Sequence, residues 1–87
     1  MPIKTLISLK PGESGIIARI DGGLGMVNRL DALGIRSGKK ITKLASGFMR
    51  GPVTIDLDRS RVAIGFGMAN RIMIEVEGLP SESITNG

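Results

Sequence analysis

The sequence contains no cysteine and no histidine. Their absence removes disulfides, thiolate nucleophiles, imidazole bases and the usual zinc ligands together. Without these side chains no ordinary pair of nucleophile and base can be assembled. We therefore expect a protein that binds a partner and is not an enzyme, and we assign no catalytic, cofactor-binding or metal-binding residue.

Aromatic residues are also scarce, since the chain has only Phe48 and Phe66 and no tryptophan or tyrosine. Proteins that bind single-stranded nucleic acid usually stack bases on aromatic side chains. We therefore expect no nucleic-acid partner. A small basic nucleic-acid-binding β-barrel is the alternative function, because the chain does carry the positive charge that phosphate contacts need.

Long apolar runs are missing too. No segment approaches the roughly 20 apolar residues of a membrane-spanning helix, and no apolar stretch of signal-peptide length follows Met1. These observations predict a cytoplasmic protein without direct membrane insertion.

What the sequence does contain is 87 residues with 13 glycines that separate short apolar segments. This pattern is typical of short strands joined by tight turns. Five strands with one helix inserted after the first suit a mostly β fold, a small closed or nearly closed barrel of SH3-like or OB type. We expect one domain over residues 1–77 and a polar, flexible tail over residues 78–87. The predicted strands are residues 16–21, 40–45, 53–58, 62–66 and 72–76.

The predicted helix runs from Leu24 to Leu33. Met26, Leu30 and Leu33 recur at i, i+4 and i+7, the spacing of one apolar helix face. Gly34 follows at the position where helices commonly end in a left-handed residue. We expect the helix to cover one open end or side of the sheet.

Positive charge is concentrated around this helix and the strand after it. The net charge is +4, and the only acid among the central basic residues is Asp31. Such a cluster suits nucleic acid, anionic lipid or an acidic protein surface, and the simpler interpretation is a solvated face. The basic residues of the cluster are Arg29, Arg36, Lys39, Lys40 and Lys43.

The loop over residues 47–51 carries Phe48, Met49 and Arg50. An exposed methionine beside an aromatic residue suits an adaptable protein contact. The alternative is that these side chains fold back onto the barrel. Phe66 continues the alternation of its predicted strand and is expected in the core.

Two weaker candidate sites remain. Residues 23–28 follow a strand and open a helix, as a dinucleotide phosphate loop does, but Asn28 stands where the last glycine is needed. Asp56 and Asp58 share one strand face, as do Glu75 and Glu77, and could gather a hard cation. We interpret the first as a turn and the carboxylates as solvent-facing side chains.

A set of short motifs gives the sequence a family resemblance. In order they are Pro11-Gly12-Glu13-Ser14-Gly15, Arg29-Leu30 with Leu33-Gly34-Ile35, Ser37-Gly38, Gly51-Pro52-Val53, Val62-Ala63-Ile64, and Ala69 with Ile72. With this order and spacing, residues 3–77 resemble the FeoA family, ferrous iron transport protein A. The resemblance implies an SH3-like barrel with an added helix. It also implies a cytosolic accessory of FeoB, the ferrous iron transporter, which is a membrane protein with a GTPase domain.

A similar domain occurs at the C-terminus of metal-dependent repressors, which also carry a DNA-binding helical domain. Because this chain begins at its own methionine without such a domain, the free-standing accessory is the better match. We expect it to dock on the cytosolic part of a FeoB-type transporter, and weak self-association stays open. The predicted partner-binding residues are Arg29, Arg36, Lys39, Lys40, Lys43, Phe48, Met49 and Arg50.

Overall fold

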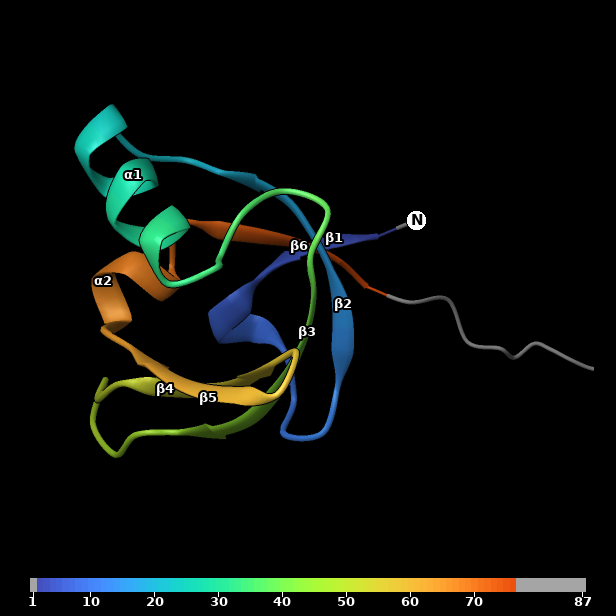
Figure 1. Ribbon diagram of the computed structural model, residues 1–87. Helices are drawn as coiled ribbons and strands as arrows, with labels where there is room; N and C mark the ends of the chain where they lie inside the picture. Colours follow the sequence, from blue (N-terminus) through green and yellow to red (C-terminus); the bar gives the residue numbers. More distant parts are fainter. Residues whose placement is uncertain (1, 77–87) are drawn as a thin grey trace, which may run out of the picture.

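Six strands form one antiparallel sheet, in the order β1-β6-β2-β3-β4-β5 (Figure 1). The computed structural model describes residues 2–76. The strands are β1 (Ile3–Thr5), β2 (Ser14–Ile20), β3 (Lys40–Ser46), β4 (Val53–Leu57), β5 (Ser60–Ile64) and β6 (Ile72–Val76). The helices are α1 (Leu24–Ala32), α2 (Phe66–Ala69) and the short 3₁₀ helix η1 (Leu6–Ser8).

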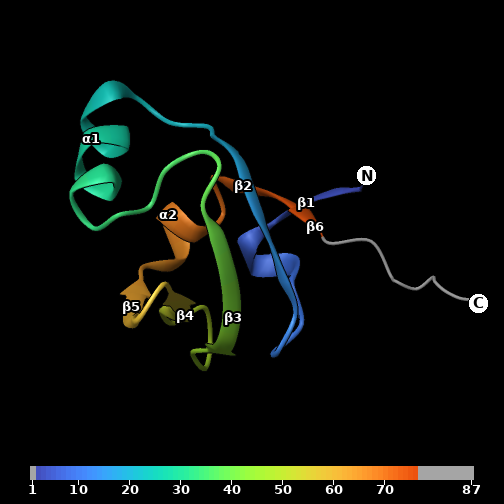
Figure 2. The ribbon, with the colours of Figure 1, turned by 45° about the vertical axis from the view of Figure 1, so that its right-hand side comes forward.

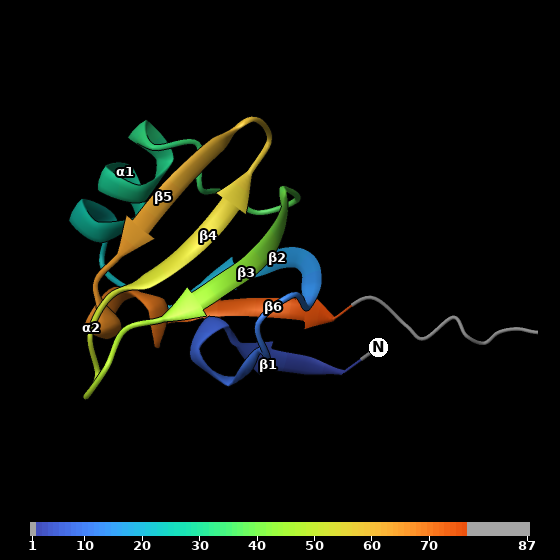
Figure 3. The same ribbon diagram turned by 90° about the horizontal axis from the view of Figure 1, so that it is seen from below.

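The sheet curls but does not close. Figure 3 shows β3, β4 and β5 side by side in one half and β6 and β1 along the other. The end strands β1 and β5 do not pair with each other within residues 2–76. The mostly β architecture is confirmed, but the expected number of five strands is wrong, because β1 pairs with β6 as a sixth. A three-residue strand is too short to show the alternation that sequence patterns reveal.

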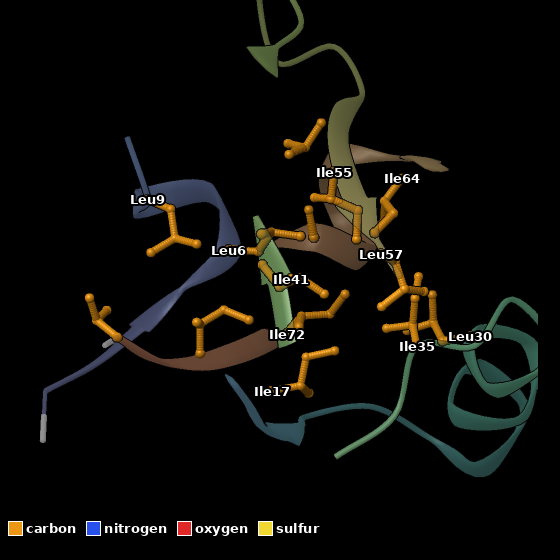
Figure 4. Close-up of a cluster of buried hydrophobic side chains, with 14 residues drawn as sticks. Leu6, Leu9, Ile17, Leu30, Ile35, Ile41, Ile55, Leu57, Ile64 and Ile72 are labelled. Carbon is orange, nitrogen blue, oxygen red and sulfur yellow. The ribbon is translucent and has the colours of Figure 1, made fainter. Parts of the chain in front are cut away.

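The core follows from alternation along the strands. Each of β4 and β6 buries every second residue, all aliphatic, and turns the residues between toward solvent. Figure 4 shows how the buried side chains of the sheet, η1 and α1 converge. Full burial of one such side chain stabilises the fold by roughly 1.5–3 kcal/mol. The core residues are Leu6, Leu9, Ile17, Leu30, Ile35, Ile41, Val53, Ile55, Leu57, Ile64, Ala69, Ile72, Ile74 and Val76.

Helix α1 ends as predicted. Gly34 has φ +87, a left-handed conformation that glycine adopts without Cβ strain. Its N–H donates to the Asp31 carbonyl, and the Ile35 N–H donates to the Leu30 carbonyl, both at 2.9 Å. These two bonds form a Schellman cap. Because Leu30 and Ile35 are both fully buried, the cap also anchors the helix to the core.

The predicted apolar face of α1 is only partly correct. Leu30 is buried and Met26 packs against the core, but Leu33 is 48% exposed. Leu33 is the C-cap residue, with φ −91 and ψ 1, so the helical periodicity no longer sets its direction. Leu24, at the other end of the helix, is 76% exposed. The helix therefore reaches the core mainly through its C-terminal half.

The segment after β5 also differs from expectation. The predicted strand 62–66 ends at Ile64, and residues Phe66–Ala69 form the single turn α2. The Ala69 N–H donates to the Gly65 carbonyl at 2.9 Å and closes this turn. Phe66, expected in the core, is therefore half-buried at the start of α2, because the helix breaks the alternation that would have turned it inward.

The predicted polar tail, residues 78–87, lies outside the described residues. Among residues 2–76, no helix has both the length and the apolar character needed to cross a membrane.

Candidate docking surface

The loop between β3 and β4 projects two apolar side chains into solvent. Phe48 is 89% exposed and Met49 is 82% exposed, so neither folds back onto the sheet. We call residues Phe48, Met49 and Arg50 the tip. Large exposed apolar side chains next to each other mark candidate contact sites.

The backbone of the tip is strained. Met49 has φ 52 and Arg50 has φ 64, and the Gly51 N–H donates to the Phe48 carbonyl at 3.1 Å. Two left-handed central residues with this bond define a type I′ turn, which normally uses asparagine and glycine. A left-handed conformation costs other residues roughly 1–2 kcal/mol each. Strain of this kind is often found where a function requires it.

The neck of the loop holds the tip in place. The Gly47 N–H donates to the Pro52 carbonyl at 2.7 Å. A Cβ on Gly47 would lie 2.7 Å from the carbonyl carbon of Gly51, so the two halves of the neck approach closely only because Gly47 has no side chain. The tip is therefore a narrow turn on a cross-bonded neck.

Arg50 connects the tip to α2. Its guanidinium carbon lies 5.8 Å from the centroid of the Phe66 ring, within the range of a cation–π contact. Phe66 thereby covers part of the arginine and adds an aromatic face next to the tip. Sequence alternation placed Phe66 in the core and so missed this contact.

Most of the predicted basic residues are exposed, but two share their charge with acids. Arg36 Nε lies 2.7 Å from Asp31 Oδ1, and Lys39 Nζ lies 3.0 Å from Asp58 Oδ2. Exposed ion pairs of this type contribute little to stability. They do reduce the net positive charge of this face. Arg29 and Lys40 are also exposed.

Lys43 does not belong to this exposed face. Its side chain is 2% exposed, and Nζ donates to the carbonyls of Ile7 at 2.8 Å and Leu9 at 2.6 Å. Burial lowers the pKa of Lys43, and the nearby Glu13 carboxylate opposes that shift. The prediction of Lys43 as a partner-binding residue is therefore wrong. Lys43 stands two residues after Ile41 on the same strand, and side chains two residues apart share one face. This alternation could have predicted that Lys43 points inward.

The structure does not place the basic residues beside the tip. Lys39 and Lys40 lie at the start of β3 and the tip follows its end. The seven residues of β3 span roughly 20 Å at about 3.3 Å per residue. The predicted residues therefore divide into two groups. One is the tip, and the other, which we call the basic face, comprises Arg29 on α1, Arg36 and Lys39 in the segment between α1 and β3, and Lys40 at the start of β3.

The geometry of the structure does not support the weaker candidate sites. Asp56 and Asp58 line a polar depression of about 210 Å³ together with Lys40 and Thr42, so cationic and acidic groups share it. Within residues 2–76, no three side chains of metal-ligand type gather to hold an ion. A pocket of about 480 Å³ lies between α1 and β2, but its Arg36 and Asp31 are already paired.

Comparison with known proteins is consistent with this geometry. A curled antiparallel sheet with α1 inserted between β2 and β3 defines a small SH3-like β domain, as the sequence predicted. The FeoA domain family model matches residues 4–76, and the chain belongs to the FeoA family.

Three similar proteins illustrate the relationship. A protein of Methanocaldococcus jannaschii named "Putative Fe(2+) transport protein A" is 41% identical over 66 residues, which cover 76% of this chain and 78% of that protein. The crystal structure of an iron uptake regulatory protein, FeoA, has a TM-score of 0.79 and 32% identity over 88% of this chain and 100% of the other. A manganese-dependent transcriptional repressor has a TM-score of 0.80 and 25% identity, over 87% of this chain but 42% of the repressor.

Proposed function

We propose that this protein is a non-enzymatic cytosolic accessory of ferrous iron uptake that docks on the cytosolic part of a FeoB-type transporter. Membership of the FeoA family and the names of its relatives support the connection to iron transport. The transporter as partner, the cytosolic location and the single domain over residues 1–77 belong to the proposal.

The observation that carries the proposal is the preformed tip. Phe48 and Met49 project from a narrow, strained turn that is cross-bonded at its neck. A partner that buries them gains the desolvation of two apolar side chains. Because the turn already has its conformation, little ordering entropy is lost on binding.

The basic face has a different role in this proposal. Exposed charges at a distance from the buried contact mainly accelerate association and make it sensitive to salt. Arg29, Arg36, Lys39 and Lys40 therefore steer an acidic partner surface toward the protein. The tip then supplies the buried contact.

The proposal is tested by co-purification with the transporter's cytosolic region. The double variants Phe48→Ala with Met49→Ala and Lys39→Glu with Lys40→Glu should both keep the parent circular dichroism spectrum. Both should lose retention, and the second should lose it in a salt-dependent manner. Leu24→Ala removes another largely exposed apolar side chain, on α1 and outside the tip, and should bind as the parent does.

Two results would contradict the proposal. Undiminished binding by both double variants would show that another face makes the contact. Absence of transporter binding together with retention of random oligonucleotides at low salt would favour the nucleic-acid class instead.

A further inference from the structure

A second candidate site lies along the free edge of β5. This strand ends the sheet order and, among residues 2–76, pairs only with β4. Ser60, Arg61 and Ala63 are exposed, and Figure 3 shows no strand beyond β5. An edge strand presents unpaired backbone groups to any chain that can add to the sheet.

The two edges of this sheet are not equally protected. β1 is three residues long, follows Pro2 and turns directly into η1. β5 is five residues long, contains no proline, and pairs with β4 in continuous register from Val53↔Ile64 to Leu57↔Ser60. Native sheets usually shorten, bulge or block an edge to prevent unwanted pairing. The described strand β5 is not shortened, bulged or blocked in this way. Its only protection against pairing is the positive charge of Arg61 and the neighbouring Arg59.

The register decides which backbone groups face outward. In an antiparallel pair, facing residues alternate between pairs that exchange hydrogen bonds and pairs that do not. The two-residue connection between Leu57 and Ser60 makes the closing pair a bonded one. Val62 and Ile64 then also bond to β4, and Arg61 and Ala63 direct their N–H and C=O groups away from the sheet.

The positive charge at this edge determines which kind of segment can pair with β5. Arg59 and Arg61 form no ion pair within the part of the chain that the structure describes, although Asp56 faces Arg61 across the ladder. A second copy of the chain would bring its own Arg59 and Arg61 to the same edge, and like charges disfavour that pairing. A segment that carries carboxylates would instead pair with both arginines.

The side-chain pattern of β5 defines the segment further. Arg61 and Ala63 point to the outer face, and Val62 lies half-buried on the inner face against the core. An added strand places alternate side chains on the same two faces. We propose that the β5 edge binds an extended protein segment by strand addition, and that this segment alternates acidic residues on the outer face with apolar residues on the inner face.

This contact is separate from the tip and does not depend on the identity of the transport partner. It lies close to the tip, however. Ile64 pairs with Val53, at the start of β4 after the tip, and Phe66 two residues later lies under Arg50. A segment that extends past Ile64 would therefore continue toward Phe66 and Arg50, so one partner could occupy both surfaces.

The test uses the purified full chain labelled with nitrogen-15 and a synthetic ten-residue peptide of alternating glutamate and valine with blocked ends. The peptide should shift the amide signals of β5 and slow hydrogen exchange at Arg61 and Ala63, while Val62 and Ile64 are protected in the free protein already. Arg61→Glu should weaken binding by about tenfold or more, the equivalent of about 1.4 kcal/mol. Arg71→Glu makes the same charge change at an exposed residue outside β5 and should leave binding within about twofold.

Two controls separate strand addition from simple charge attraction. Ala63→Pro removes one outward N–H without removing a bond to β4, since proline is tolerated on the solvent side of an edge strand. It should keep the fold by circular dichroism and lose peptide binding. A peptide that is N-methylated at every residue keeps every charge but lacks the backbone donors on both of its edges, and it should not bind.

Several results would overturn the inference. These are no binding of the acidic peptide at millimolar concentration, equal binding of the N-methylated peptide, or equal binding by Ala63→Pro and Arg61→Glu. A concentration-dependent dimer that Ala63→Pro dissociates would show that a second copy occupies the edge. Oligonucleotide binding that depends on Arg61, without peptide binding, would assign the edge to nucleic acid.

Discussion

The Lys43 ammonium donates a hydrogen bond of 2.6 Å to the carbonyl oxygen of Leu9, 34 residues earlier in the chain. The same Nζ donates to Ile7, and the Lys43 backbone exchanges bonds with Gly12 and Glu13. One residue of β3 thereby satisfies a carbonyl within η1 and the buried carbonyl of the residue that follows η1. The positive charge of Lys43 suggested a surface residue, but the side chain instead stabilises the interior.

Replacing Lys43 should destabilise the protein strongly. Lys43→Ala removes a buried aliphatic stem and leaves two carbonyls without their donor, so we expect the free energy of unfolding to fall by about 2–4 kcal/mol. Urea denaturation measures it. Lys10→Ala removes an exposed lysine nearby and should change stability by less than about 0.5 kcal/mol. Equal effects of the two variants would contradict the buried role.

The same residue predicts a pH dependence. Burial lowers the pKa of Lys43 below its ordinary value of 10.5 in the folded protein, so the unfolded chain binds this proton more tightly. Stability contributed by Lys43 should therefore rise with pH between the lowered folded pKa and the ordinary value. Denaturation at several pH values between about 8 and 11 tests this. Lys43→Met should lack that rise, and an identical pH profile in both proteins would disprove it.

Gly34 should be needed for the end of α1. Gly34→Val places a β-branched side chain at φ +87, and its Cβ would lie 3.3 Å from Leu57 Cδ2. We expect a loss of roughly 1–2 kcal/mol in the free energy of unfolding. The matched pair Gly34→Ala and Gly67→Ala separates conformational strain from the loss of glycine, because φ is not positive at Gly67 and nothing crowds its Cβ. Only the first should lower the melting temperature.

Relief of the strain in the tip should raise the stability of the protein and weaken its binding to the partner. Met49→Asn places a residue that tolerates the left-handed region at φ 52, so the free energy of unfolding should rise by about 0.5–1 kcal/mol. Retention of the transporter's cytosolic region should fall, since an apolar contact is lost. Phe48→Asn makes a similar change where φ is not positive and should weaken retention without stabilising the fold. Comparable stabilisation by both variants would mean that turn strain is not the cause.

The isolated domain should not hold Fe(II) tightly. Asp58 is paired with Lys39 at 3.0 Å, and Lys40 lies in the same depression as Asp56. Nearby ammonium groups oppose a bound cation electrostatically. Anaerobic calorimetric titration should therefore show no micromolar site. A stoichiometric site that disappears in Asp56→Asn or Asp58→Asn would refute this prediction.

The local pattern of the sequence determined much of the fold. Alternation predicted strands over residues 53–58 and 72–76 with the correct buried faces, because the pleat itself turns every second side chain to one side. The first of these strands ends one residue earlier, at Leu57. The glycine at position 34 predicted the end of α1, because a residue without Cβ suits a left-handed cap wherever the chain runs. Local composition placed Phe48 and Met49 in a loop but left open whether they fold back onto the barrel, and the structure shows both exposed.

Only the tertiary structure decided the roles of Lys43, Phe66 and β5. Whether Lys43 faces water depends on carbonyls supplied 34 residues earlier, and such long-range partners leave no trace in local spacing. Phe66 left the core because α2 begins there, which places its ring under Arg50 from another loop. The free edge of β5 exists only because the sheet order leaves this strand last. Local residues set each strand's faces, but the pairing of distant strands sets which edges and charges remain open to a partner.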